Sequence, residues 1–175
     1  MARELSSRGK RLNRFAQAGG AQIKDWKEGV SIERDLDTIE KLLLRSATSR
    51  WRLATLKRTH ANQLRASRPA RYRSAVSRYY YAMYHAMRAC VFLYNQGDDF
   101  QEHSALPLHI PDDFPSRNHW QTKLKNARET RNRADYDLYP QSDQAWKNAA
   151  LALRADADLL LKETRAYLAN KGCPL

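Results

Sequence analysis

The amino-acid sequence predicts an all-α protein: an antiparallel bundle of four to five helices that follows a basic N-terminal arm. Two observations predict this fold class. Apolar residues recur at three- and four-residue steps over four long segments, and no segment alternates apolar and polar residues as a half-buried strand does. At 175 residues, the chain is long enough for one domain to bury a core. We expect the arm over residues 1–30 and the bundle over residues 31–172.

The arm and the first helix are predicted from glycines and from a capping serine. Four glycines fall within the first 30 residues, which indicates a partly mobile segment with at most a helical turn over residues 11–18. Ser31 is a suitable N-cap for the first helix of the bundle, because Glu33 and Asp35 follow it in the first turn. The apolar pattern continues to about residue 64, and Pro69 then breaks it.

A second helix is expected over residues 69–95, with Gly97 as its C-terminal stop. The connection that follows holds three prolines in nine residues and cannot form one regular element. A connection of this length inside a compact domain is usually functional or mobile. The apolar stripe of the second helix comprises Val76, Tyr80, Met83, Tyr84, Met87, Val91 and Tyr94.

Two further helices complete the predicted bundle. The third should begin near Ser116, turn Trp120, Leu124 and Ala127 inward, and end by Pro140. The last should begin after Ser142 and carry apolar residues at helical steps to residue 168. Four apolar stripes on helices of this length are typical of an antiparallel bundle.

Positive charge is concentrated in the first part of the chain. Residues 1–73 hold 18 Lys and Arg against 7 Asp and Glu, whereas residues 74–175 hold 13 against 12. A field of this kind attracts polyanions, and phosphate contacts from Lys and Arg supply most of the sequence-independent affinity for nucleic acid. The alternative is a basic surface that serves solubility alone.

Several common function classes lack their signatures here. Cys90 and Cys173 form neither a disulfide framework nor a metal set, and the five histidines do not stand at metal-ligand spacing. No glycine-rich phosphate loop, paired CxxC, HExxH or GxSxG motif occurs. We therefore expect no metal and no cofactor. Neither a signal peptide nor a membrane-spanning run of apolar residues is visible, which predicts a cytoplasmic protein without membrane contact.

The segment RNRADYDLYP, residues 131–140, crowds two arginines, two aspartates and two tyrosines before a proline. Arg131 and Asp135 stand four residues apart and can pair on one helix face. Two interpretations stay open. Either the cluster ties a helix end to the second helix, or it binds phosphate, with Asp135 holding the plane of the Arg131 guanidinium and Tyr136 beside them.

Two separated segments carry a family resemblance. The string SRYYYAMYHAMRACVFLYNQG resembles the second helix of one branch of the HEPN superfamily, and ETRNRADYD is similar to that branch's Arg-x-x-Ala-Asp-Tyr segment. Between them, EHSAL resembles the branch's Ser-His-Ser element, and DADLLLKETRAYL resembles its closing helix. The resemblance covers about residues 45–170 and leaves the basic arm outside.

The resemblance implies a homodimeric helical bundle in which the arginine-bearing helix ends of two subunits face one cleft. Many HEPN proteins are metal-independent ribonucleases whose motif is an arginine followed, after four to six residues, by a histidine. Here Tyr136 stands where that histidine would be, and the pKa of a tyrosine is about 10 in peptides, so it is a poor base at neutral pH. His85 or His103 from a neighbouring segment could supply the titrating group.

These considerations give the candidate site residues. Arg131, Asp135, Tyr136 and His85 are the candidates for catalysis. The candidates for contact with nucleic acid are Arg128, Arg133, Arg78, Tyr81, His103, Lys10, Arg11 and Arg14. We also expect some of Tyr79, Tyr81 and Phe92 to form an aromatic face that only a second copy of the chain can cover.

Three function classes stay open at this point. The first is a toxin or defence effector that cleaves RNA in a composite dimer cleft. The second is a module that binds nucleic acid or nucleotide without catalysis. The third is a partner protein whose activity belongs to another chain. The resemblance implies that some relatives work beside a nucleotidyltransferase that modifies a tyrosine, for which Tyr136 or Tyr139 is the candidate here. An antitoxin is the other partner that we consider.

Overall fold

The computed structural model describes residues 7–33, 36–139 and 141–175, and over these residues the chain is all-helical, as the sequence predicts. Along these described residues, six α-helices and one short 3-10 turn follow one another. They are α1 (Ser7–Ala16), α2 (Gly20–Glu33), α3 (Leu36–Ala66), α4 (Tyr72–Asn95), η1 (Leu106–His109), α5 (Arg117–Tyr136) and α6 (Asp143–Asn170).

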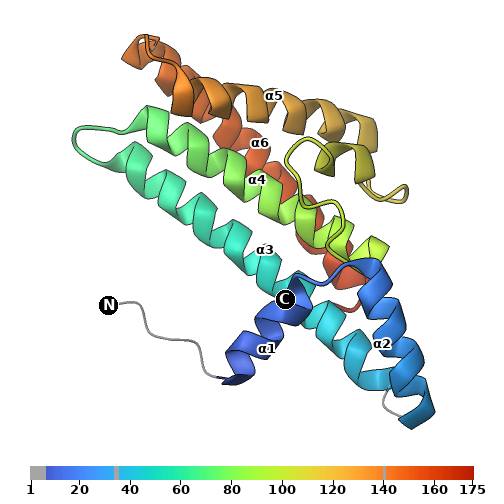
Figure 1. The fold of residues 1–175 in the computed structure, drawn as a ribbon. Helices are drawn as coiled ribbons and strands as arrows, with labels where there is room; N and C mark the ends of the chain where they lie inside the picture. Colours follow the sequence, from blue (N-terminus) through green and yellow to red (C-terminus); the bar gives the residue numbers. More distant parts are fainter. Residues whose placement is uncertain (1–6, 34–35, 140) are drawn as a thin grey trace.

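Helix α4 forms the centre of the bundle. It packs against α3, α5 and α6, and Figure 1 shows α3, α4 and α5 side by side with α6 behind them. Thirteen of the 24 residues of α4 are buried, which leaves only a narrow stripe of this helix at the surface. That stripe contains Arg78, Tyr81 and His85, at the three- and four-residue steps that keep side chains on one face.

The predicted starts of the last two helices are confirmed. Helix α5 begins directly after Ser116, and α6 begins after Ser142, whose side chain accepts a hydrogen bond from the Ala145 amide at 3.3 Å. Helix α4 also ends where the sequence predicts, but Gly97 acts differently from a simple stop. Gln96 takes the left-handed conformation with φ 54, and Gly97 is needed because its Cα lies against the α1–α2 turn.

The N-terminal segment differs from the expected arm. In place of a partly mobile stretch, α1 and α2 form, and Phe15, Ala18 and Ile23 join the hydrophobic core. The physical reason is that the glycines at 19 and 20 make a tight turn. The Asp98 amide donates to the Ala18 carbonyl at 3.0 Å, and this contact fixes the turn on the end of α4.

The start of α3 also differs from the prediction. Residue 31, the expected N-cap, falls inside α2, and α3 begins at Leu36. The residues between α2 and α3, including Asp35, lie outside the described residues. A long helix then continues to Ala66, as the apolar pattern predicts.

The proline-rich connection between α4 and α5 is well anchored. Leu106, Ile110 and Phe114 are buried in the core, and the Tyr167 hydroxyl donates to Asp113 at 2.8 Å. At the start of the connection, the buried carboxylate of Asp98 accepts from the Arg88 Nε at 2.9 Å and pairs with Arg50 at 3.0 Å. These contacts hold the connection over one side of α4.

The expected aromatic dimer face is corrected by the structure. Tyr79 and Phe92 are fully buried in the core of the single chain, and the Tyr79 hydroxyl donates to Asn62 Oδ1 at 2.6 Å. Only Tyr81 stays partly exposed. The reason is that α4 is covered on three sides, so its aromatic residues are used within the bundle.

No helix in the described part of the chain combines the length and hydropathy that crossing a membrane requires.

Candidate functional site

The arginine segment lies where the end of α5 meets α4. Arg131 pairs with Asp135 one turn further on, with 2.7 Å between Nε and Oδ2. Its Nη2 donates to the Tyr81 hydroxyl on α4 at 2.6 Å, and its Nη1 donates to Asn132 at 3.1 Å. The guanidinium also lies over the rings of Tyr81 and Tyr136, 5.2 and 5.4 Å from their centroids. Its plane is therefore fixed by partners on two helices.

The carboxylate of Asp135 connects the two helices as well. The Ser77 hydroxyl on α4 donates to it, at 2.8 Å to one oxygen and 3.0 Å to the other. Arg73, one turn earlier on α4, donates to the Ala134 carbonyl and to the Asp137 carbonyl, the latter at 2.8 Å. Two arginines and one serine thus hold the C-terminal end of α5, so the cluster is a structural clip as well as a candidate site.

An open hollow of about 390 Å³ lies beside this cluster. Helix α5 contributes Arg128, Arg131 and Asn132, and the connection after α4 contributes Glu102, His103 and Ser104. Residues almost 30 positions apart in the sequence therefore meet at one surface. The hollow brings together two guanidinium groups and one imidazole, which are the group types that bind phosphate and transfer protons.

His103 is held by aromatic neighbours from α4. Its ring lies 4.2 Å from the ring of Tyr84, and its Nδ1 lies 2.6 Å from the Tyr80 hydroxyl, within hydrogen-bonding distance. Burial lowers the pKa of His103 below its ordinary value, and the charges of Arg131 and Arg128 lower it further. His103 is therefore neutral at physiological pH, and an imidazole in that state can accept a proton.

His85, the other candidate histidine, does not line this hollow. Its ring stacks near Tyr81 and meets Tyr84 edge-on, with centroid distances of 6.3 and 5.1 Å. Its Nδ1 is buried without a hydrogen-bond partner. Burial lowers the pKa of His85 to about 4, and Arg88 and Lys57 add to the shift. His85 is therefore a neutral packing residue, one helical turn after Tyr81 on α4.

The other predicted residues lie at several places. Tyr136 is 68% exposed beside Arg131, and Arg133 is exposed and points back to Thr130. Arg78 lines a different hollow, between α3 and α4. Lys10 and Arg14 lie on α1, and the side chain of Arg11 lies outside the described part of the structure.

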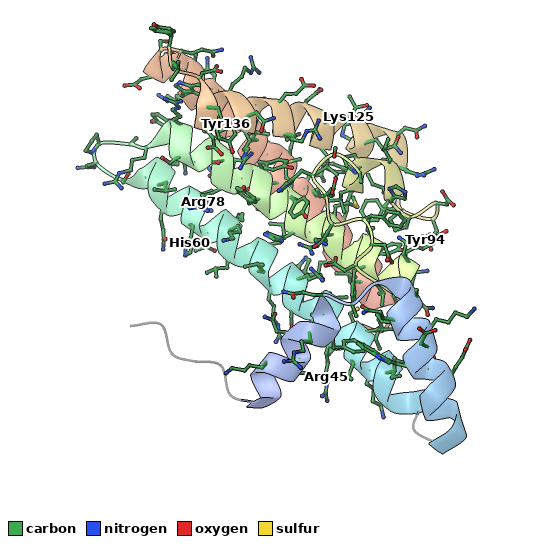
Figure 2. All side chains as sticks on the ribbon, in the orientation of Figure 1. Arg45, His60, Arg78, Tyr94, Lys125 and Tyr136 are labelled. Atoms are coloured by element: carbon green, nitrogen blue, oxygen red, sulfur yellow. The ribbon has the colours of Figure 1, made fainter. Side chains whose placement is uncertain are left out.

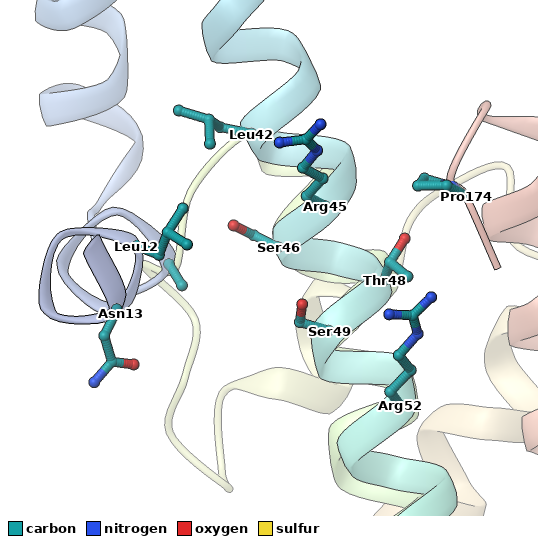
Figure 3. Close-up of a pocket in the computed structure, with 11 residues that line it drawn as sticks. Leu12, Asn13, Leu42, Arg45, Ser46, Thr48, Ser49, Arg52 and Pro174 are labelled. Atoms are coloured by element: carbon teal, nitrogen blue, oxygen red, sulfur yellow. The ribbon is translucent and has the colours of Figure 1, made fainter. Parts of the chain in front are cut away.

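A larger hollow, of about 550 Å³, lies elsewhere. Figure 3 shows it between α1 and α3, with Leu12 facing Ser46 and with Arg45 and Arg52 on one face of α3. The described residues that line it include no histidine and no aromatic residue. It therefore lacks both a group that transfers protons near neutral pH and a ring on which a base could stack, and we do not assign the chemistry to it.

The sequence did not identify those site residues that are distant in the sequence from the residues they contact. Arg73, Ser77 and Tyr80 all lie on α4. Arg73 is 61 residues and Ser77 is 58 residues away in the sequence from its partner on α5. The signal that could have found Arg73 and Ser77 is that polar residues interrupt an otherwise apolar helix on the face of α4 that is not fully buried. A metal site is not indicated, because no group of three metal-binding side chains occurs among the described residues.

Comparison with known proteins adds no family to this geometry: no family model, no curated protein and no solved structure matches the chain. The residues around the hollow therefore provide the evidence for a function.

Proposed function

We propose that the chain is a metal-independent endoribonuclease of the HEPN type, acting on RNA as a toxin or defence effector. One observation carries the proposal: Arg131, Arg128 and His103 line a single open hollow. The fold supports it, because a helical bundle with the arginine segment at the end of one helix is what the resemblance implies. The net charge of +12 supports a polyanionic substrate.

The residues have distinct roles in this reaction. Arg131 binds two phosphoryl oxygens with its forked guanidinium, and Asp135 keeps that fork in place. His103 takes the proton from the ribose 2′-hydroxyl, whose oxygen then attacks phosphorus. The bond to the 5′ oxygen breaks, and that oxygen takes a proton from water in the open hollow. The products are a 2′,3′-cyclic phosphate and a 5′-hydroxyl.

Tyr80 supports the proposed base. Its hydroxyl can accept from Nδ1–H of His103, which leaves the lone pair on Nε2. Burial raises the pKa of Tyr80, so this hydroxyl keeps its own proton at neutral pH. We expect the reaction rate to be constant at and above the ordinary pKa of histidine. The rate should fall only at lower pH, as the pH drops through the lowered pKa of His103.

The proposal is tested by incubating total RNA with the purified chain in excess chelator. Wild type should cleave, and Arg131→Ala and His103→Gln should each lose activity by about 100-fold or more. Arg131→Lys should rescue poorly, because an ammonium cannot reproduce the fork. Arg154→Ala removes another arginine paired with an aspartate four residues on, and this control should cleave like wild type.

Two results would contradict the proposal. One is a folded wild-type chain that cuts no RNA. The other is cleavage at the wild-type rate by both Arg131→Ala and His103→Gln.

The homodimer with a composite cleft belongs to the same proposal. The hollow is open, so a second copy could close it, and the exposed side chains Tyr136 and Leu138, 68% and 87% exposed, lie at this helix end. Light scattering at tens of micromolar protein tests the pairing. Wild type should be a dimer and Tyr136→Glu/Leu138→Glu a monomer, whereas a monomeric wild type would contradict a composite cleft.

A second candidate function is a partner protein that is modified on tyrosine. Tyr139 is 93% exposed just after α5, which favours it as an acceptor for a nucleotidyltransferase. Mass spectrometry of the chain purified from its native cells should then show a nucleotide on Tyr139 or Tyr136. An unmodified segment in cells that make the transferase would contradict this candidate.

A further inference from the structure

We propose that the RNA strand bound by Arg131 continues across α4 into a second phosphate-binding hollow between the end of α3 and the start of α4. This inference rests on the proposed function and deepens it, because it identifies where the substrate strand is held away from the reacting phosphate.

The second hollow has the chemistry of an anion site. It has a volume of about 360 Å³ and is lined by His60, Gln63, Leu64, Ser67, Arg71 and Arg78. Both arginines are exposed, and neither side chain forms an ion pair or hydrogen bond within the described part of the chain. No acidic side chain occurs among the described residues that line it. Two free guanidinium groups and one exposed imidazole therefore face solvent together.

The two hollows are separated by one helix. Ser77 bonds Asp135 on the α5 side, and its neighbour Arg78 lines the hollow on the α3 side. Tyr81, which accepts from Arg131, lies one turn further on the exposed stripe of α4. An α-helix rises about 1.5 Å per residue, so Arg78 and Tyr81 are about 4.5 Å apart along the axis. Figure 2 shows Arg78 and His60 close together, with Tyr136 at the neighbouring end of α5.

The exposed stripe of α4, beside both hollows, is also favourable for binding a polyanion. Towards the other end of α4 it continues past His85 to Arg88, and Lys57 on α3 is close enough to act on His85. Within this stretch, Asp98 is already bound by Arg88 and Arg50, and Asp135 by Arg131 and Ser77. The unpaired charges that face solvent at the second hollow are positive.

Single-stranded RNA fits this surface better than an acidic peptide does. An acidic peptide would need apolar pockets for its anchoring side chains, and the second hollow offers one aliphatic side chain, Leu64. RNA needs cations for its phosphates and a flat ring for a base. Arg71 and Arg78 supply the first, and the exposed ring of His60 supplies the second.

The test is fluorescence anisotropy with labelled 2′-O-methyl oligouridine, which the proposed reaction cannot cleave. A strand of about 12 nucleotides has enough phosphates to occupy both hollows, whereas a dinucleotide has one internucleotide phosphate and can occupy only one of them. Arg71→Glu/Arg78→Glu should weaken binding of the long strand at least about tenfold. It should also reduce the slope of log affinity against log salt by about 1.4, because two phosphate contacts are lost. Binding of the short strand should change little.

The matched control reverses two exposed lysines on α6, which lies behind α4 in Figure 1. Lys147→Glu/Lys162→Glu makes the same change in net charge and should leave the salt slope for the long strand near that of wild type. Melting curves verify that both variants fold. If the glutamate pair melts lower, Arg71→Gln/Arg78→Gln removes the charges without adding new ones and should reduce the slope equally.

The outcomes separate this inference from the proposed function. If Arg131→Ala weakens binding and the Arg71/Arg78 pair behaves like the α6 control, the second hollow is refuted and the proposed function stands. If both hollow and control variants weaken binding equally, net charge alone acts and the second hollow is also refuted. If wild type binds neither strand, the proposed function fails first. If the Arg71/Arg78 variant weakened binding of the short strand as much as binding of the long strand, that result would also contradict a strand that spans both hollows.

Discussion

Arg131 has two consequences at the scale of the single residue: it presents a guanidinium to the hollow, and it ties α5 to α4. Its side chain is 16% exposed and that of Asp135 is 28% exposed, so the pair is more buried than a helix-end pair on an open surface. An exposed ion pair at a helix end is expected to contribute at most about 1 kcal/mol of stabilisation. The hydrogen bond to Tyr81 changes that expectation.

Arg131→Ala should therefore lower the free energy of unfolding by about 1.5 to 3 kcal/mol, the range for hydrogen bonds to charged groups. Arg154→Ala, which removes a looser pair at 3.6 Å, should cost less than about 0.5 kcal/mol. Urea unfolding measures both. A loss above about 5 kcal/mol for Arg131→Ala would mean that the residue is mainly a structural clip.

His85 makes stability depend on pH. Its pKa is about 4 in the folded chain and about 6.5 in unfolded chains, so the unfolded state binds the proton first. The stabilisation from a neutral His85 is fully present above pH 6.5 and is lost as pH falls through about 4. We expect His85→Gln to lose less stability than wild type between these two pH values.

Urea unfolding at several pH values measures this difference. His119→Gln removes an exposed histidine on α5 and should keep the wild-type profile. A His85→Gln profile parallel to wild type over the whole range would show that burial of His85 does not couple to folding.

Local spacing predicted part of the site. The Arg131–Asp135 pair follows from a four-residue step, and Tyr136 beside it follows from the same helix end. The contact between Arg131 and Tyr81 joins residues 50 apart, and no local pattern determines such a pairing. The same holds for His103, whose position depends on how the proline-rich connection is anchored.

At the scale of the element, the most informative contact is the one between the α1–α2 turn and the end of α4. A Cβ placed on Gly97 would lie 2.2 Å from the backbone nitrogen of Gly20. The Gly20 amide also donates to Asp99 at 2.7 Å. Because backbone cannot move aside as a flexible side chain does, this position accepts only glycine.

Gly97→Ala should therefore destabilise the chain by at least about 3 kcal/mol or undock α1 and α2. Melting and limited proteolysis within residues 1–33 measure the two possibilities. Gly172→Ala is the control: its φ of +86 makes alanine strained, but nothing lies within 4 Å of the new Cβ. It should cost about 1 kcal/mol. Equal effects of the two substitutions would contradict the close approach at Gly97.

The sequence predicted the helices whose ends carry strong signals and missed those that depend on packing. Serines 116 and 142 set the starts of α5 and α6. Helices α1 and α2 are short, and their glycines suggested mobility. Phe15 and Ile23 become buried only because α3 and α4 offer a surface for them. Tertiary contacts, rather than intrinsic propensity, determine this part of the fold.

At the scale of the whole molecule, the excess of positive charge in residues 1–73 now has a structural setting. The first helices are part of the core, so deleting residues 1–30 would remove the buried side chains of Phe15 and Ile23 as well as charge. Charge reversal on α1 is the cleaner test of nucleic-acid contact. Lys10→Glu/Arg14→Glu should reduce the salt slope of RNA binding by about 1.4 with little change in melting temperature.

Anisotropy with a labelled oligonucleotide measures this slope, with the α6 lysine pair as the control. A salt slope equal to that of wild type would mean that the basic face of α1 serves solubility or contacts protein instead.

The central claim is that Arg131 and His103 cleave RNA through the ribose 2′-hydroxyl without a metal. The most direct measurement uses a DNA strand with one ribonucleotide, incubated in excess chelator, with products identified by mass spectrometry. Wild type should cut only after the ribonucleotide and leave a 2′,3′-cyclic phosphate and a 5′-hydroxyl, while Arg131→Ala leaves the strand intact. Cleavage of the all-deoxy strand, loss of activity in chelator, or an uncut strand with folded wild-type protein would contradict the account.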